Sequence, residues 1–411
     1  MKKRILSLIL ALSMVLSVLP LGAFAADPPE LVMGANGLPV YSEGTVGHNW
    51  VYMNGTLCLL YGTFDFSSTH PQNTSAGTQT ARPVACPIEI ESDAEITGGI
   101  FEKAVTNNGG TIYDGTFNTM VENNVVSWGT LGKIVGGAFN GTVTNKGTIS
   151  GGAFAGNVTN SGTIFDGTFK STGIVTSIVT NSGTISGGTF QSKCSVENEG
   201  NIEKGTFAGE VTNYGAINNG TFEGTVKNYS GGTISGGTFA GSVQNMWDIS
   251  GGTFQSTGSV ENNGTIEKGT FEGSVINYAT ISDGTFNGKV SNRQGGSITN
   301  GTFNYTVENV GGGISNGTFT HKVENNDHGT IFGGTFAGGV NNSNDGNILG
   351  GVINGYIDVL GVGVYPITVH EASPDAKIEK VNGVAADWKP YVVIDGDALP
   401  EVTITASTKI Y

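Results

Sequence analysis

Residues 146–160 read Lys-Gly-Thr-Ile-Ser-Gly-Gly-Ala-Phe-Ala-Gly-Asn-Val-Thr-Asn, and this phrase recurs sixteen times between Ile96 and Ile353. Its template is Ile-x-x-Gly-x-Phe, followed by Val-x-Asn. Every copy has Ile first and Gly three residues later, and only the last copy replaces Phe, with Ile353. Such a fixed repeat indicates a solenoid, a fold in which each copy packs only on its neighbours.

The copies differ in length at only two places. The Ile-to-Phe distance never changes, whereas the chain lengthens between Phe and Val, as at 170–177, and between Asn and the next Ile, as at 229–233. Where length is fixed the backbone is held by its neighbours, and where it varies the chain forms outward loops.

The repeat has no helical periodicity and is rich in Gly and β-branched residues, which argues against a helical solenoid. Each copy offers three short extended pieces, centred on Ile, Phe and Val. Stacked about 4.8 Å apart, these pieces form three parallel sheets. We therefore expect an all-β fold, a single-stranded parallel β-helix (β-solenoid) of about 16 coils of 15–17 residues. It should be three-sided and right-handed, roughly 75 Å long, with β caps at both ends.

Three features of the repeat support this coil. Proline is absent between Pro87 and Pro366, as a ladder that uses every backbone N–H requires. The invariant Gly suits a corner with positive φ. The Asn of Val-x-Asn suits another corner because Asn tolerates the left-handed region, and stacked Asn amides can hydrogen-bond from rung to rung.

Residues 1–25 have the pattern of a secretory signal peptide. Lys2, Lys3 and Arg4 precede an apolar stretch, and Ala23-Phe24-Ala25 forms a small-residue cleavage site. We expect export to the medium or the cell surface, with no membrane insertion after cleavage. The formal charge is −15, and loss of three cations from 19 leaves 16 against 34 acids, or −18. This balance argues against nucleic acid or an anionic membrane as partner.

The flanks do not keep the phrase. Residues 26–95 are expected to form an N-terminal β cap, in which 51–66 reads as two strands about an Asn-Gly turn and 67–83 as a loop. The repeat domain is expected over 96–357.

Residues 358–411 alternate like strands and are either a C-terminal cap or the start of a small β domain. The expected strands are 363–370, 377–381, 391–394 and 401–406, with turns at Asn382-Gly383 and Asp395-Gly396.

Residues for catalysis or metal binding are scattered. Asp114, Asp166 and Asp283 precede the invariant Gly, but other copies have Gly, Asn or Lys at that position. The five His show no ligand spacing, and the Asp that calcium-binding coils need in every rung is missing. We predict no enzyme, no cofactor and no metal site.

The three cysteines leave two readings open. A disulfide between Cys58 and Cys86 is compatible with an oxidising compartment and would leave Cys194 in an outer loop. Unpaired buried cysteines are the alternative.

Two surface columns are candidate binding features. The first is a column of Thr directly before the Phe, which would suit an ice lattice, although Thr is also a common outward strand residue. Its members are Thr168, Thr189, Thr206, Thr221, Thr238, Thr253, Thr270, Thr285, Thr302, Thr318 and Thr335.

The second column follows the Asn and is aromatic in the middle of the repeat: Tyr214, Tyr229, Trp247 beside Met246, and Tyr278. Aromatic side chains along one edge can stack on sugar rings or anchor a protein partner. The alternative is that they cover a Gly-rich corner and pack on each other.

The leader, the Gly-Thr-Ile-Ser-Gly-Gly-Thr-Phe phrase at 183–190 and the Val-x-Asn steps together resemble β-helical repeat regions of secreted and cell-surface proteins, including adhesins, from Gram-positive bacteria. Residues 392–406 also look like the opening of small β repeats in bacterial surface proteins. The resemblance implies an exported structural or adhesive rod whose partners are glycans or host or cell-surface proteins. A glycan-binding or glycan-degrading β-helix protein is the alternative, and an ice-binding protein a minor one.

Overall fold

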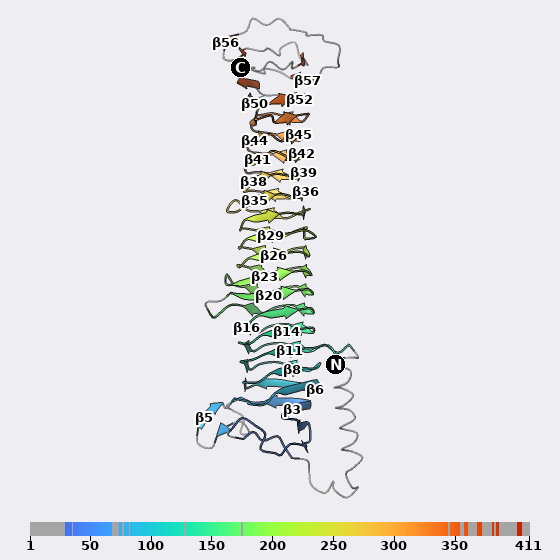
Figure 1. The fold of residues 1–411 in the computed structure, drawn as a ribbon, viewed down its shortest axis with the longest axis vertical. Helices are drawn as coiled ribbons and strands as arrows, with labels where there is room; N and C mark the ends of the chain where they lie inside the picture. The colour runs from blue at the N-terminus through green and yellow to red at the C-terminus, as the bar shows by residue number, and fades with distance from the viewer. Residues whose placement is uncertain are drawn as a thin grey trace.

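The computed structural model describes residues 29–353, except 35, 68–73, 76–77, 82, 127–128, 174–175 and 344–345, together with five strands beyond residue 353. The predicted leader lies outside the described residues. The described chain is an all-β parallel β-solenoid of about 15 turns, stacked in a single column (Figure 1). It has no helix in these residues, so none that would be long and apolar enough to span a membrane.

The first side of the coil is the Phe ladder, in which each strand pairs in parallel with the equivalent strand of the next turn, as Phe207 does with Phe222. Its strands are β7 (Ile100–Phe101), β10 (Thr116–Phe117), β13 (Ala138–Phe139), β16 (Ala153–Phe154), β19 (Thr168–Phe169), β22 (Thr189–Phe190), β25 (Thr206–Phe207), β28 (Thr221–Phe222), β31 (Thr238–Phe239), β34 (Thr253–Phe254), β37 (Thr270–Phe271), β40 (Thr285–Phe286), β43 (Thr302–Phe303), β46 (Thr318–Phe319), β49 (Thr335–Phe336) and β52 (Gly351–Ile353).

The second side is the Val ladder, which carries the Val-x-Asn steps. Its strands are β8 (Val105–Asn107), β11 (Val121–Asn123), β14 (Val143–Asn145), β17 (Val158–Asn160), β20 (Ser177–Asn181), β23 (Cys194–Asn198), β26 (Val211–Asn213), β29 (Val226–Asn228), β32 (Val243–Asn245), β35 (Ser259–Asn262), β38 (Ser274–Asn277), β41 (Val290–Asn292), β44 (Val307–Val310), β47 (Val323–Asn326), β50 (Val340–Ser343) and β53 (Ile357–Leu360).

The third side is the Ile ladder, whose fifteen strands number the rungs: rung 1 contains Ile112, rung 8 contains Ile234 and rung 15 contains Ile348. They are β9 (Thr111–Ile112), β12 (Lys133–Ile134), β15 (Thr148–Ile149), β18 (Thr163–Ile164), β21 (Thr184–Ile185), β24 (Asn201–Ile202), β27 (Ala216–Ile217), β30 (Thr233–Ile234), β33 (Asp248–Ile249), β36 (Thr265–Ile266), β39 (Thr280–Ile281), β42 (Ser297–Ile298), β45 (Gly313–Ile314), β48 (Thr330–Ile331) and β51 (Asn347–Ile348).

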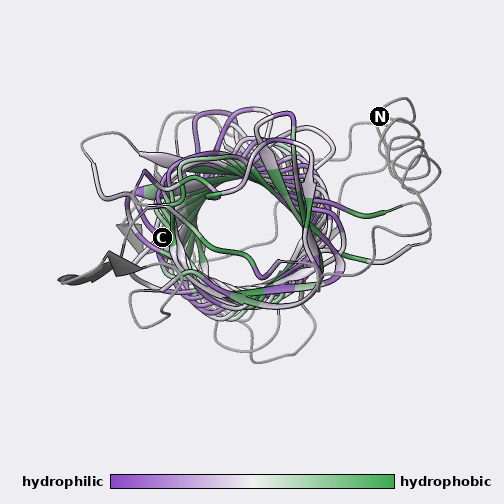
Figure 2. Ribbon diagram, turned by 90° about the horizontal axis from the view of Figure 1, so that it is seen from below, coloured by the Kyte–Doolittle hydropathy of each residue, from purple (hydrophilic) through white to green (hydrophobic). Residues whose placement is uncertain are grey.

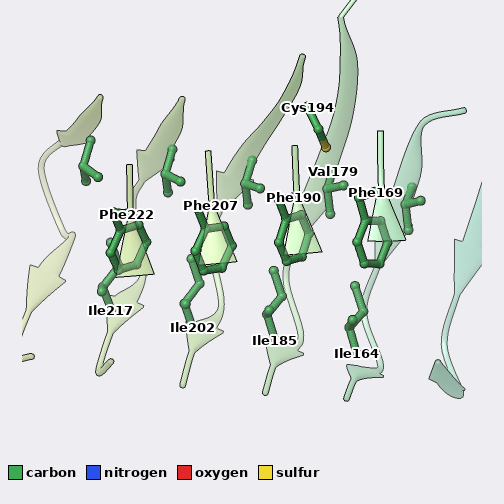
Figure 3. Packing of buried hydrophobic residues seen from close by; sticks show 14 of the residues in the cluster. Ile164, Phe169, Val179, Ile185, Phe190, Cys194, Ile202, Phe207, Ile217 and Phe222 are labelled. Atoms are coloured by element: carbon green, nitrogen blue, oxygen red, sulfur yellow. The ribbon is translucent and has the colours of Figure 1, made fainter. Parts of the chain in front are cut away.

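The three ladders confirm the expected three-sided coil; its right-handed sense stays a prediction. Seen along the axis, the turns superpose around a common interior (Figure 2). Ile202, Ile217 and Ile234 are fully buried. Figure 3 shows how Ile, Phe and Val side chains pile up in separate columns inside the coil.

Consecutive Phe rings from Phe101 to Phe336 stack with centroids 4.5 to 4.9 Å apart and planes 4 to 11° from parallel. Burial of each ring contributes about 2–3 kcal/mol relative to exposure, and each ring pair adds about 1 kcal/mol.

Two glycine corners make the tight turns possible. At Gly220, φ is 132°, and an added Cβ would lie 3.1 Å from Cε2 of Phe222. At Gly215, in the corner before the Ile, a Cβ would lie 2.2 Å from the carbonyl oxygen of Gly200 in the rung below. Backbone conformation disfavours a side chain at Gly220, and the carbonyl of the neighbouring turn leaves no room for one at Gly215.

The buried asparagines form a hydrogen-bonded amide column, the Asn ladder, from Asn107 to Asn342. Each Nδ2 donates to Oδ1 of the next Asn, as Asn198 does to Asn213 and Asn213 does to Asn228, at 2.7 and 2.8 Å. The expectation that these Asn adopt the left-handed region is wrong, because the described non-Gly residues with positive φ are Asn54, Asp327 and His328. The ladder itself is the reason for Asn: it satisfies a polar group that the corner buries.

The N-terminal cap begins with a hairpin. Strands β2 (Trp50–Met53) and β3 (Thr56–Asp65) pair antiparallel about Asn54 and Gly55, whose φ values of 53° and 70° confirm the predicted turn. Strand β1 (Thr45–Val46) pairs with β2, and a short antiparallel pair, β4 (Thr74–Ser75) with β5 (Thr78–Ala81), lies within the predicted loop.

The parallel stack starts inside the predicted cap. Strand β3 pairs in parallel with β6 (Ile88–Gly98), and β6 in turn pairs with both β8 and β9. Trp50 is fully buried at this end, and the edge of the Phe66 ring packs against Phe101 at 5.7 Å and 80°. These side chains cover the first rung, which would otherwise expose its apolar interior.

At the other end, β57 (Glu401–Ile404) pairs in parallel with β52 and with β54 (Thr368–Glu371), so it continues the Phe ladder. Strands β55 (Lys380–Val381) and β56 (Val384–Ala385) pair antiparallel across the predicted Asn382-Gly383 turn. The predicted strand at 391–394 lies outside the described residues.

Candidate functional site

The predicted aromatic side chains lie along one corner of the coil, between the Val and Ile ladders, and are called the aromatic edge below: Tyr214, Tyr229, Met246, Trp247 and Tyr278. Register places them there because Tyr214, Tyr229, Met246 and Tyr278 each directly follow a buried Asn of the Asn ladder, and Trp247 follows Met246. Tyr214 is 47% exposed, and Met246, Trp247 and Tyr278 are each 43% exposed, whereas Tyr229 is half-buried.

Only two of the four predicted ring residues contact each other. The rings of Tyr214 and Tyr229 stack with centroids 5.4 Å apart and planes 14° from parallel. Because the two residues sit in successive rungs, their faces point along the rod and their edges point outward. Trp247 and Tyr278 make no ring–ring contact with another described residue. The Tyr pair therefore presents edges to a ligand that approaches from the side, which suits protein contact better than stacking on a sugar face.

Trp247 occupies a position that the repeat otherwise reserves for small residues. The residue two before the Ile is Gly in thirteen of fifteen rungs; Ala279 and Trp247 are the exceptions. In the next rung, a Cβ on Gly264 would lie 2.0 Å from the carbonyl oxygen of Trp247. The sequence prediction included Trp247 only as an aromatic residue and did not recognise that it replaces a Gly. Aligning the copies on their Ile would have shown this replacement. A large, exposed side chain placed against the local packing rule marks a candidate functional residue.

The Thr column before the Phe is in register over eleven consecutive rungs, as the pairing of Thr221 with Thr238 illustrates. The neighbouring outward position, directly after the Phe, is mixed in charge and size: it holds Lys170, Glu223 and Glu272 in three of the copies. A flat lattice-matching surface needs both rows to be uniform, so this face does not provide one.

The acids that precede the invariant Gly act on the backbone. Oδ1 of Asp114 accepts a hydrogen bond from the N–H of Gly115 at 2.7 Å, and Asp166 and Asp283 do the same for their own Gly. Asn219 makes the equivalent bond at 2.8 Å, so the charge is not required. These carboxylates support the corner rather than gathering at a reaction site.

The outer face of the Val ladder carries ion pairs between neighbouring rungs. Lys227 Nζ lies 2.9 Å from Glu210 Oε2, and the hydrogen bond to Glu210 raises the pKa of Lys227. Burial opposes ionisation of Glu308, but hydrogen bonds from Lys289 and Ser291 outweigh it and lower the pKa of this carboxyl. The cations are thus matched to acids on a solvent-exposed face.

The described cysteines are three free, buried thiols. Cys58 lies between Leu57 and Leu59, whose side chains enter the core, so it points outward, 3.6 Å from Oε2 of Glu89. Cys86 belongs to the core, on the opposite side of the sheet, which explains why the two do not pair as the disulfide reading expected. Burial raises the pKa of Cys58 to about 12 and that of Cys86 to about 11.

The expected outer-loop position of Cys194 is wrong. Cys194 begins β23 and points inward, only 1% exposed, because the chain inserted after Phe190 returns to the Val ladder two residues early (Figure 3). Within the described residues, no three His, Cys, Asp or Glu side chains gather closely enough to hold a metal ion.

No protein-family model, curated protein or solved structure matches this chain.

Proposed function

We propose that this chain is an exported bacterial surface protein, secreted or held at the cell surface, whose β-solenoid acts as a non-catalytic structural and adhesive rod. The observation that supports this most is the unbroken core: the Ile ladder and the Asn ladder continue through all fifteen rungs without a break in register. At about 4.8 Å per rung, this stack keeps its ends about 70 Å apart.

The outer surface supports a non-catalytic role. The Asp side chains before the invariant Gly hold backbone N–H groups, and three Lys side chains on the Val ladder side, Lys227, Lys289 and Lys322, are paired with Glu. Binding would then come from long, shallow faces, with glycans or host and cell-surface proteins as partners and neither nucleic acid nor membrane lipid among them.

The second candidate function is that of a glycan-binding protein, and the exposure of Trp247 favours it. An exposed indole can cover the face of a sugar ring, and it stands where the corner needs glycine. Nothing in the arrangement of the acids favours glycan cleavage, and the mixed outer rows of the Phe ladder argue against ice binding.

The adhesive role is tested by probing an array of glycans and extracellular-matrix proteins with the purified chain and with a matched variant. The variant carries Tyr214→Ser, Tyr229→Ser, Trp247→Gly and Tyr278→Ser, which install residues that other copies have at these positions and so preserve the fold. We expect the chain to bind at least one array component and the variant to bind it at least tenfold more weakly, a loss of about 1.4 kcal/mol or more.

Equal binding by both proteins would remove the aromatic edge as the site. Absence of binding to every component would overturn the adhesive role. Export is tested separately by N-terminal sequencing of the protein recovered from cell walls and medium, where the expected first residue is Ala26.

A further inference from the structure

Most of the exposed large apolar residues on and beside the Ile ladder have an apolar counterpart at the same distance on the other side of rung 8. Phe165 in rung 4 and Tyr278 in rung 11 are the exceptions, because Thr299 and Ser182 stand at the mirrored positions. One group is the outward residue directly after the Ile, the outer column. Most rungs have Ser, Asn, Thr or Glu there, and the large apolar exceptions are Tyr113, Val135, Phe165, Phe332 and Leu349 in rungs 1, 2, 4, 14 and 15. These side chains are between 40% and 56% exposed.

The second group is the aromatic edge, which lies along the other border of the Ile ladder. It is about four residues before the outer column in each rung. Its Tyr214, Tyr229 and Met246-Trp247 occupy rungs 7, 8 and 9. Apolar groups thus lie at both ends of the outer column and in the middle of the opposite border, with polar side chains between them.

We propose that two copies of this chain pair face to face through the Ile ladder, with the rods antiparallel and a two-fold axis crossing rung 8. This two-fold axis is perpendicular to the rods and lies in the plane between the two faces. Each column of side chains therefore faces the same column of the second copy, and rung n faces rung 16 − n. Tyr113 then faces Leu349 of the second copy, and Val135 faces Phe332. On the other border Tyr214 faces Met246 and Trp247, while Tyr229 faces itself.

The same axis relates two charged dipeptides. In the outer column Glu occurs only in rungs 6 and 10, each time followed by Lys: Glu203-Lys204 and Glu267-Lys268. The proposed axis brings these two dipeptides opposite one another. Glu203 then faces Glu267 and Lys204 faces Lys268, while each Glu also has a Lys of the second copy one residue away diagonally, so the net charge of the four side chains is zero. In rungs 7 to 9 the other outward positions of the Ile ladder hold small or polar residues and one charge, Asp248, which would lie opposite Ala216 of the second copy.

Parallel pairing fits the pattern less well. An axis along the rods would place the aromatic edge of one copy against the outer column of the other in the same rungs. There Tyr214, Tyr229 and Trp247 would face Asn218, Ser235 and Ser250. The antiparallel axis therefore brings together more of the apolar residues on both borders.

The face is long enough for a stable pair. Fifteen rungs at about 4.8 Å give a strip about 70 Å long and, across four residues, about 13 Å wide. This corresponds to on the order of 800 Å² per copy, the size of a standard protein–protein interface. The pairing does not depend on the adhesive role, and it accounts for the exposed aromatic edge without a glycan.

The first test is sedimentation equilibrium of the full purified chain across the micromolar range. We expect a dimer, and we expect Phe332→Ser to weaken it at least tenfold because a symmetric interface loses each side chain twice. Ser315 stands at the equivalent position of the preceding rung, so this variant keeps its fold. Thr253→Ser, on the Phe ladder, is the matched control and should leave the dimer unchanged. A monomeric chain at every concentration would overturn the proposal.

The second test fixes the orientation. Facing sheets lie about 10 Å apart, beyond the reach of a disulfide, so a short bismaleimide is the suitable crosslinker. We expect crosslinked dimers when Val135→Cys and Phe332→Cys chains are mixed, and none from either chain alone. The native Cys58, Cys86 and Cys194 are buried and provide a low background. Crosslinking of Tyr229→Cys with Ser235→Cys chains, without crosslinking of Tyr229→Cys with itself, would instead show parallel pairing and contradict the antiparallel axis.

Discussion

In the N-terminal cap, paired strands carry different side chains in register, whereas in the rod each rung repeats the one before it. Leu57 faces Ile88 and Leu59 faces Ile90 between β3 and β6, but Ile217 faces Ile234 in the rod. Identical rungs fit one another equally well after a shift by a whole repeat. The irregular cap fits in only one way, so it determines where the coil begins.

The rod and the cap also differ in how they bury polar groups. The rod places an amide in every turn and joins the amides into one column, while the equivalent position in the cap is the apolar Ile90, opposite Asn107. The column therefore ends there: Oδ1 of Asn107 is buried without a hydrogen-bond partner.

Phe254→Asp should disrupt the rod most severely. The substitution places an unpaired carboxylate inside a dry stack between Phe239 and Phe271, at a cost of more than about 4 kcal/mol. Amide hydrogen exchange should accelerate over several rungs on both sides. The adjacent outward substitution Thr253→Asp is the control and should change exchange little. Unchanged thermal unfolding of Phe254→Asp would contradict a stacked core.

Trp50→Ala should loosen the cap and the first rungs while leaving the middle of the rod intact. Loss of a fully buried indole costs about 3–5 kcal/mol, and its Nε1–H bond to the carbonyl of Pro29 is lost with it. Limited proteolysis should then cut near the N-terminal end first. Cleavage distributed evenly along the rod would show that the cap does not protect that end.

Asn213→Ala and Asn107→Ala should differ although both remove an Asn from the same column. In mid-column the change leaves Asn228 Oδ1 without its donor and ends the bond from Asn198, at a cost of about 2–4 kcal/mol. At the end of the column, Asn107 accepts nothing, so only its donated bonds are lost and we expect about half that cost. Chemical unfolding of the two variants measures the difference, and equal losses would refute a directional column.

Glu91→Gln should produce the smallest change, and a stabilising one. Burial raises the pKa of Glu91 above its usual value, so its ionised form is disfavoured in the folded chain. Because the pKa of Glu91 is higher in the folded chain than in the unfolded chain, ionising this carboxyl destabilises the fold. The destabilisation appears as the pH rises past the unfolded pKa and persists at neutral pH. Gln removes the penalty while still accepting a bond from Asn108. The gain in melting temperature at pH 7 should vanish near pH 4; the same gain at both values would argue for a packing effect instead.

The rod could be predicted almost completely because stacking makes each position repeat its chemistry. Fixed Ile-to-Phe spacing identified the strands, and the buried Ile202 and Ile217 confirm it. The cap was harder. Its parallel pairing between β3 and β6 joins different side chains, so no repeated letter marks it, and the stack starts before Ile96.

Prediction of the surface was weaker, since outward positions are free to vary. The tyrosine pair was placed correctly along one corner, but its mutual stacking depends on ring orientation, which spacing does not specify. The prediction for Cys194 was wrong because the extra residues after Phe190 were assigned entirely to a loop. The last of them instead extend strand β23.

The amide column gives the rod a dipole moment along its axis. Every Nδ2 donates toward higher residue numbers, so the side-chain dipoles from Asn107 to Asn342 add head to tail, much as peptide dipoles add along a helix. The N-terminal end acquires partial negative character and the C-terminal end partial positive character, although the backbone ladders contribute little net dipole. In an antiparallel pair of rods the two dipoles point in opposite directions and attract each other side by side. In a parallel pair they would point in the same direction and repel.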